Sequence, residues 1–174
     1  MLLARQGFAS TVIMILDSWQ FQGGGMDDID FVAEALKEAE EAAARGECPV
    51  GAVIVREGEI IARSGNRVVE LKDPTAHAEI VALREAGEAL GVWNFPDCTV
   101  YSSLEPCPMC ENAMLQAEVP KVVYGGSAFP IALEKRFSLA NLERVGPIMQ
   151  ECRVPVADWL RRIGRVDVLE DEGI

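Results

Sequence analysis

Histidine is nearly absent from this sequence: the chain of 174 residues contains one, His77. Basic side chains are also scarce, with 16 lysines and arginines against 28 aspartates and glutamates, so the formal net charge is −12. Proteins that bind RNA or DNA tightly draw much of their affinity from basic side chains that displace counterions. The densest basic run, Arg161, Arg162 and Arg165, stands among acids. The composition therefore argues against a nucleic-acid partner.

Long apolar runs are absent as well. The longest one near the N-terminus, Val12 to Leu16, is shorter than the core of a signal peptide and far shorter than the roughly 20 residues of a membrane span. The five cysteines are odd in number and include one short-range pair, which is not the pattern of a secreted disulfide framework. The sequence therefore predicts a cytoplasmic protein that does not enter a membrane.

The length and the apolar content of 49% fit one globular domain. Residues 1–25 end in three glycines, and Met26 then opens an acidic segment with helical periodicity. We interpret residues 1–25 as a disordered leader or the result of a misassigned start codon. Residues 26–174 are expected to form a single domain.

Helical spacing alternates with short β-branched runs along this domain. Glu57-Gly58, between two such runs, predicts a tight hairpin. Strands that alternate with helices favour a layered α/β domain with helices on both faces of the sheet. Helices are expected from residue 28 to Gly46, over 75–90 and 107–118, and around 134–143 and 156–164; strands are expected over 50–56, 59–63, 98–102 and 121–124.

One imidazole and two thiols stand at a spacing that suits a metal. His77 is followed thirty residues later by Cys107, and Cys110 completes a C-x-x-C pair. Zinc prefers this set of nitrogen and sulfur ligands, and three protein ligands leave the fourth tetrahedral position open for catalysis. A structural zinc site would need a fourth ligand, for which Cys48 or Cys98 is the alternative.

Glu79 stands two residues after His77, too close to share its helical face as a further ligand. A carboxylate beside the metal can instead take a proton from a reacting water molecule and deliver it to the substrate. We therefore expect His77, Cys107 and Cys110 to hold one Zn²⁺ per chain and Glu79 to act as the catalytic proton shuttle.

His-x-Glu followed by Pro-Cys-x-x-Cys is the signature of zinc-dependent base deaminases. The match extends from about residue 48 to residue 126 and includes Pro49-Val50-Gly51-Ala52-Val53, Gly65-Asn66-Arg67, Asp73 to Glu79 and Ser103 to Cys110. The chain thus resembles the cytidine deaminase-like superfamily. Within it, the resemblance is to the branch that contains guanine deaminase, fungal-type cytosine deaminase and bacterial tRNA adenosine deaminase.

The resemblance implies a three-layer α/β/α fold around a mixed five-stranded sheet, a catalytic zinc, and a homodimer or larger oligomer. It also implies that Asn66 hydrogen-bonds the substrate ring and that the main-chain carbonyl of Glu105 holds the substrate amino group. By similarity to fungal-type cytosine deaminases, Phe129 would stack on the base and Asp171 would cap the active site.

The substrate within this branch depends on weaker signals. Bacterial tRNA adenosine deaminases usually continue after the last matching strand with a Lys-Thr-Gly-Ala-like loop and a basic helix, whereas this chain continues with Gly126 to Pro130 and ends in an acidic tail. Together with the net charge, this difference favours hydrolytic deamination of a free nucleobase, guanine or cytosine, in nucleobase salvage. The alternative is tRNA adenosine-to-inosine deamination. A non-catalytic zinc-binding subunit is a third hypothesis, which the presence of Glu79 disfavours.

Overall fold

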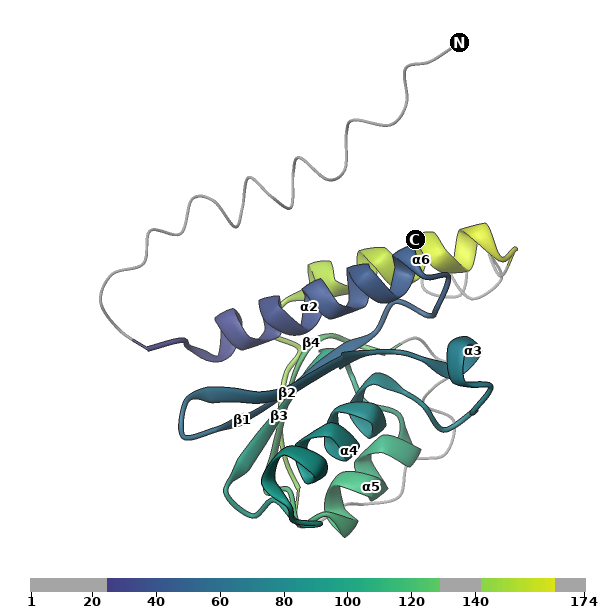
Figure 1. The fold of residues 1–174 in the computed structure, drawn as a ribbon. Coiled ribbons are helices and arrows are strands. Elements are labelled where there is room, and N and C mark those ends of the chain that lie inside the picture. The colour runs from purple at the N-terminus through teal and green to yellow at the C-terminus, as the bar shows by residue number, and fades with distance from the viewer. Residues whose placement is uncertain (1–24, 129–141, 165–174) are drawn as a thin grey trace.

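A mixed five-stranded sheet forms the middle layer of the computed structural model, which describes residues 25–128 and 142–164 (Figure 1). In the described residues the strands lie in the order β2-β1-β3-β4-β5, with β1 antiparallel to both neighbours and β3, β4 and β5 parallel. Their bounds are β1 (Gly51–Arg56), β2 (Glu59–Gly65), β3 (Cys98–Leu104), β4 (Lys121–Gly126) and β5 (Glu143–Val145).

Helices cover both faces of this sheet. On one face lie α2 (Asp28–Ala44) and α6 (Arg153–Arg162), and on the other lie α4 (Ala78–Leu90) and α5 (Pro108–Gln116) (Figure 1). Two short helices, α3 (Val68–Leu71) and the 3-10 helix η2 (Gln150–Cys152), belong to the connections. The expected three-layer α/β/α fold is confirmed.

Alternation of side chains along each strand divides the core between the two faces. On β1, Ile54 packs with the cluster under α4 and α5, whereas its neighbours Val53 and Val55 pack with the cluster under α2. On β3, Val100 and Tyr101 divide in the same way. The sheet is therefore buried on both sides, as the apolar runs of its strands require.

The β1–β2 hairpin turns at Glu57-Gly58, as predicted. Both residues have positive φ, 53° and 81°, the backbone that suits a two-residue turn between twisted strands. The other end of the hairpin lies very close to α2: a Cβ on Gly65 would lie 2.6 Å from the carbonyl oxygen of Glu38. Glycine at this position allows the close contact and so fixes the point at which the chain continues into Asn66.

The helix expected over 75–90 begins three residues late, at Ala78. The carboxylate of Asp73 accepts hydrogen bonds from the N–H (2.8 Å) and the hydroxyl (2.6 Å) of Thr75. These bonds hold the chain in a turn, which competes with the helix. His77 consequently occupies the N-cap position of α4.

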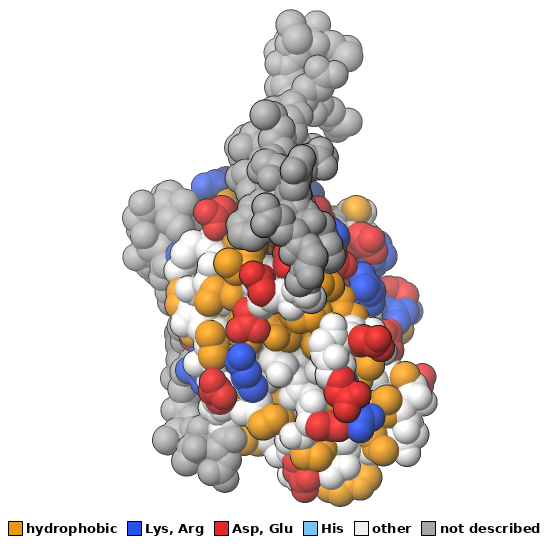
Figure 2. All heavy atoms as spheres, turned by 90° about the vertical axis from the view of Figure 1, so that its left-hand side faces the viewer, with side chains coloured by type: hydrophobic (Ala, Val, Ile, Leu, Met, Phe, Trp, Pro, Cys, Tyr) orange, Lys and Arg blue, Asp and Glu red, His pale blue; other side chains and the backbone are white. Residues whose placement is uncertain are grey.

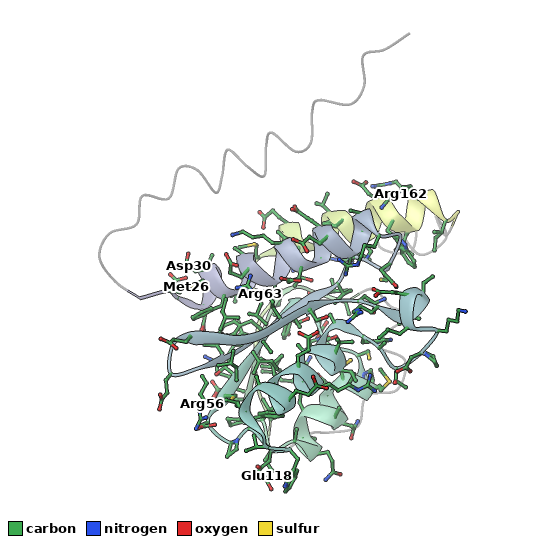
Figure 3. All side chains as sticks on the ribbon, in the orientation of Figure 1. Met26, Asp30, Arg56, Arg63, Glu118 and Arg162 are labelled. Atoms are coloured by element: carbon green, nitrogen blue, oxygen red, sulfur yellow. The ribbon has the colours of Figure 1, made fainter. Side chains whose placement is uncertain are left out.

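The helix expected around 134–143 is wrong at its end, because Glu143 begins β5 and pairs with Lys121. Residues 134–141 of that expected helix lie outside the described residues, as do Phe129, Asp171 and residues 1–24 of the expected leader. Arg63 of β2 lies against α2 (Figure 3), where its guanidinium donates to Glu34 at 3.0 Å. Among the helices that the structure describes, none has the length and apolar character needed to span a bilayer.

Candidate active site

The three predicted metal ligands meet at the N-termini of α4 and α5. His77 is the N-cap of α4, Cys107 is the N-cap of α5, and Cys110 lies in the first turn of α5. The two Sγ atoms lie 3.6 Å apart, and His77 Nδ1 lies 3.6 Å from Cys107 Sγ and 3.5 Å from Cys110 Sγ. The fold therefore brings one nitrogen and two sulfur atoms, thirty residues apart in the sequence, to a single point.

These distances fit zinc. Bond lengths of about 2.3 Å to sulfur and about 2.0 Å to nitrogen, at tetrahedral angles, separate ligand atoms by roughly 3.5–3.8 Å. In the described residues, the cluster of metal-binding side chains contains His77, Cys107 and Cys110. Cys48 and Cys98 lie outside this cluster, so the geometry supports the open three-ligand site rather than a closed structural one.

The surroundings of Cys107 favour a thiolate. The contact between its Sγ and the Sγ of Cys110, with the help of His77 and against the effect of burial, lowers the pKa of Cys107 to about 4. The contact between His77 Nδ1 and Cys107 Sγ raises the pKa of His77. The positive ends of two helix dipoles add to the stabilisation of negative charge. Thiolate is the form of cysteine that binds zinc.

Glu79 lies beside the ligands in the first turn of α4. Its side chain is 2% exposed, and it accepts hydrogen bonds from the hydroxyl of Ser102 (3.4 Å) and the thiol of Cys110 (3.5 Å). Burial raises the pKa of Glu79 because the charged form loses hydration. A carboxyl group with a raised pKa takes up a proton more readily, which suits the expected role of a proton shuttle.

Asn66 is buried at the end of the hairpin, 6% exposed. The next residue, Arg67, donates its main-chain N–H to the carbonyl of Ala76 at 3.0 Å, which ties this segment to the residue before His77. The amide nitrogen of Asn66 donates to the carboxylate of Glu47 at 3.2 Å. Sequence reasoning missed Glu47, because a single glutamate in an acidic segment carries no signal that it is buried.

Glu105 precedes the C-x-x-C pair, and its carboxylate accepts hydrogen bonds from the main-chain N–H of Ala128 (3.0 Å) and from Arg144 of β5 (2.7 Å). Arg144 also forms an ion pair at 2.7 Å with Glu111, whose side chain is 3% exposed and directly follows Cys110. One guanidinium thus joins carboxylates on both sides of the two cysteines. No local sequence pattern indicates this contact, because Arg144 lies 39 residues after Glu105.

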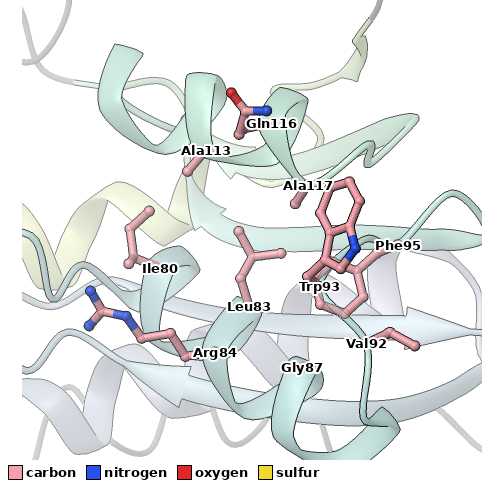
Figure 4. A pocket seen from close by; sticks show the side chains of 10 residues that line it. All are labelled: Ile80, Leu83, Arg84, Gly87, Val92, Trp93, Phe95, Ala113, Gln116 and Ala117. Carbon is pink, nitrogen blue, oxygen red and sulfur yellow. The ribbon is translucent and has the colours of Figure 1, made fainter.

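An apolar groove between α4 and α5 is separate from the metal ligands (Figure 4). Leu83, Trp93 and Phe95 lie along it, and Trp93 is 69% exposed. None of the three metal ligands lines the groove. The groove and the proposed metal site are therefore separate features of this side of the sheet.

Comparisons with known proteins agree with the metal site. A family model described as the cytidine and deoxycytidylate deaminase zinc-binding region matches residues 26–126. The chain is 37% identical over 142 residues to the tRNA-specific adenosine deaminase of Bacillus subtilis, an alignment that covers 76% of this chain and 88% of that protein. It is 54% identical over 100 residues to the chloroplastic tRNA(adenine(34)) deaminase of Arabidopsis thaliana, covering 58% of this chain and 8% of that protein.

The chain is 49% identical over 94 residues to the tRNA-specific adenosine deaminase of Aquifex aeolicus, an alignment that covers 62% of that protein. It therefore spans less than two thirds of the length of this relative and of the Arabidopsis thaliana relative. A solved structure from a study of A-to-I editing by tRNA:A34 deaminases matches with a TM-score of 0.60 and 40% identity over 66% of this chain and 95% of that chain. Guanine deaminase from Bacillus subtilis matches with a TM-score of 0.59 and 32% identity over 78% and 95%.

These relatives correct the expected substrate. The sequence favoured a free nucleobase, a role in nucleobase salvage and the absence of a nucleic-acid partner, and these predictions were wrong: the tRNA adenosine deaminases match at 37–54% identity. Net charge misled because it is a sum over the whole chain. Residues 27–47 contain eight acidic and two basic side chains and so contribute half of the net negative charge. These residues belong largely to α2, which lies across the sheet from α4 and α5.

The surface shown in Figure 2 carries acidic and basic side chains interspersed with apolar ones. Such a mixture shows that the total charge is a poor guide to the potential at any one site. The structure describes a single chain, so the expected homodimer or larger oligomer stays a prediction.

Proposed function

Because the chain belongs to the zinc-binding deaminases of the cytidine and deoxycytidylate deaminase family, we propose that it converts adenosine to inosine in tRNA. The observation that carries the proposal is the match to the tRNA-specific adenosine deaminase of Bacillus subtilis over 88% of that protein's length. The reaction is a hydrolysis: water supplies the oxygen that replaces the amino group on C6 of adenine, and ammonia leaves.

The described residues divide this work between them. His77, Cys107 and Cys110 would hold a zinc ion, which would supply the Lewis acidity that makes water nucleophilic at neutral pH. Glu79, buried beside these ligands, takes the proton from water and gives it to the ring nitrogen, and later to the leaving ammonia. Asn66 and the main-chain carbonyl of Glu105 bind the base.

A loop of tRNA suits such a buried site. A base in a single-stranded loop can leave the stack and enter a pocket at a cost of about a few kcal/mol. The cost is greater for a base that is paired in a helix. The five cysteines of the chain are free thiols, so we also infer that the protein works in a reducing compartment such as the cytoplasm.

The test is a panel of substrates given to the purified, zinc-loaded protein. An anticodon stem-loop RNA with adenosine at the wobble position is expected to give inosine, read as guanosine after reverse transcription, with an equal amount of ammonia. The same RNA with guanosine at that position is the matched control and is expected to release none. Free adenosine, guanine and cytosine complete the panel.

Ammonia release from guanine or cytosine without any change in the RNA would contradict the proposal. An exposed carboxylate on β2 provides a matched control for the enzyme: Glu59→Gln is expected to edit the RNA at the wild-type rate. Both the wild type and this variant would then be treated with a chelator and resupplied with Zn²⁺. Loss of activity in the first step and its return in the second would link the reaction to the metal.

A further inference from the structure

Glu47 is a buried carboxylate that the chemistry described above does not use. It stands between α2 and β1, and it is 1% exposed. An ionised carboxylate removed from water is costly unless it is paired or fully hydrogen-bonded. In the part of the chain that the structure describes, three N–H donors surround it and no lysine or arginine forms an ion pair with it.

Each of the three donors belongs to the segment that contains Asn66. Oε2 of Glu47 accepts hydrogen bonds from the side-chain amide of Asn66 (3.2 Å) and from the main-chain N–H of Val69 (3.0 Å). Oε1 accepts the main-chain N–H of Glu70 (2.8 Å). The last two donors lie in the first turn of α3, where N–H groups have no partner within the helix. Glu47 thus fixes the amide of Asn66 and the backbone that follows it.

The chemistry of the pair also fixes which way the amide faces. An ionised carboxylate has acceptors only, whereas an asparagine amide has a donor side and an acceptor side. Because the nitrogen of Asn66 must face Glu47, the carbonyl oxygen and the remaining N–H are left for other partners. An asparagine without such a neighbour could rotate its amide by half a turn and exchange the two sides.

This corner lies beside the catalytic one. Burial raises the pKa of the Cys48 thiol to about 12, and the nearby negative charges of Glu79 and Glu47 act in the same direction. The main-chain hydrogen bond from Arg67 to Ala76 joins the same segment to the start of α4. The orientation of the Asn66 amide is therefore set within the same buried region as Glu79.

We propose that Glu47 is a positioning residue, which holds the amide of Asn66 in the one orientation that can bind the substrate base. The inference rests on the proposed role of Asn66. It explains why a carboxylate is buried here without a cation. It also predicts that Glu47 acts on the substrate only through Asn66, so the kinetic effects of changing the two residues should not multiply.

The experiment is a double-mutant cycle on RNA deamination with Glu47→Gln, Asn66→Ala and the double variant. Glutamine has the same shape but turns one of its acceptor positions into a donor, which opposes one of the three N–H groups. We expect Glu47→Gln to raise KM about tenfold with a smaller change in kcat, because binding to the base is weakened before the transition state as well as in it. In the Asn66→Ala background, the same change is expected to alter kcat/KM by less than twofold.

A merely structural role would give a different result. If Glu47 only supports the fold, its substitution would lower kcat/KM by the same factor in both backgrounds, and that outcome would overturn the inference. Glu34→Gln is the matched control, since it removes an ion-paired carboxylate from α2 and is expected to leave the kinetics unchanged. If Glu47→Gln does not fold, Glu47→Asp keeps the charge but shortens the reach, and it is expected to raise KM in the same cycle.

The cycle also distinguishes this inference from the proposed function. Wild-type kinetics in Asn66→Ala would refute the role of Asn66, and with it the action of Glu47 through Asn66. A large effect of Asn66→Ala together with no effect of Glu47→Gln would refute the inference alone. RNA that remains unedited by the wild-type enzyme would refute the proposed function itself.

Discussion

The helices α2 and α4 cover opposite faces of one sheet, and they begin in opposite ways. Asp27, the N-cap of α2, accepts hydrogen bonds from Ile29 N–H (2.9 Å) and Asp30 N–H (3.0 Å) on its side chain. The carboxylate of Asp30 in turn accepts one from the main-chain N–H of Asp27 (3.0 Å). His77, the N-cap of α4, makes no such side-chain hydrogen bond. The same is true of Cys107 at the start of α5.

A side-chain cap contributes about 0.5–2 kcal/mol to the stability of a helix. α2 has this contribution through the side chains of Asp27 and Asp30. α4 and α5 lack it, since the residues at their N-caps are the proposed metal ligands, and the first turn of α4 also buries the carboxylate of Glu79. The comparison indicates that local helix stability was exchanged for chemistry at the two N-termini that meet.

His77→Asn tests this exchange most severely. Asparagine is among the best N-cap residues and histidine is not, so the metal-free variant should be more stable than the metal-free wild type by about 0.5–1 kcal/mol. The same change removes the nitrogen ligand, so zinc content and turnover should be lost. Zinc per chain, deamination rate and the urea midpoint of both metal-free proteins would be measured. A variant that still carries one zinc per chain would refute the ligand assignment.

Glu79→Gln is expected to separate chemistry from stability. Glutamine keeps the shape of the side chain but cannot shuttle the proton, so kcat should fall by about 10²–10⁴-fold while zinc stays bound. The free energy of unfolding should not fall, because a neutral amide loses less hydration than a buried carboxylate. Turnover, zinc content and the melting temperature decide the outcome. Wild-type kcat in this variant would show that another group moves the proton.

The same contrast explains how far the sequence could be interpreted. α2 was predicted correctly because its apolar period, acidic first turn and terminal Gly46 all agree with the structure. α4 was placed three residues early because Thr75 belongs to a turn closed by Asp73, a competing hydrogen bond that periodicity does not reveal. The short strand β5 has too few residues for an alternating pattern to appear.

The candidate site divides in a similar way. His77, Glu79, Cys107 and Cys110 could be predicted because each stands in a short local motif, and the fold only had to bring two helix N-termini together. Glu47 and its partner Asn66 could not be paired in advance, since 19 residues separate them and only burial shows that they need each other. The predicted substrate was wrong because a net charge does not show where in the fold the charged side chains lie.

Arg144→Gln tests whether the start of α5 depends on a support outside its own helix. The guanidinium holds the carboxylates of Glu105 and Glu111 on either side of the cysteines, and residues that orient metal ligands typically contribute 10–100-fold to metal affinity. We expect about a tenfold weaker affinity for zinc, measured by competition with a chelating dye. Arg161→Gln, which removes an ion pair from α6, is the matched control and should bind zinc as the wild type does.

Unchanged zinc affinity in Arg144→Gln would mean that the uncapped N-terminus of α5 holds its cysteines without help from β5. The melting temperature of Arg144→Gln must be measured alongside its zinc affinity. Glu111 loses the ion pair with Arg144 in this variant, and a general loss of stability would lower zinc binding indirectly. Affinity measured well below the melting temperature separates the two effects.

Asp27→Ala gives the smallest effect and tests the other half of the comparison. Removing the Asp27 half of the capping box should lower the free energy of unfolding by about 1 kcal/mol, because the first-turn N–H groups of Ile29 and Asp30 lose their acceptor. Zinc content and kcat should stay at the wild-type values, since α2 lies across the sheet from α4 and α5, whose N-termini carry the proposed ligands. Denaturant unfolding and RNA deamination would be measured for Asp27→Ala and for Asp27→Asn, which keeps an acceptor at the cap. A fall in kcat with either substitution would show that the two faces of the sheet are coupled, and the division between a capped scaffold helix and uncapped ligand helices would then fail.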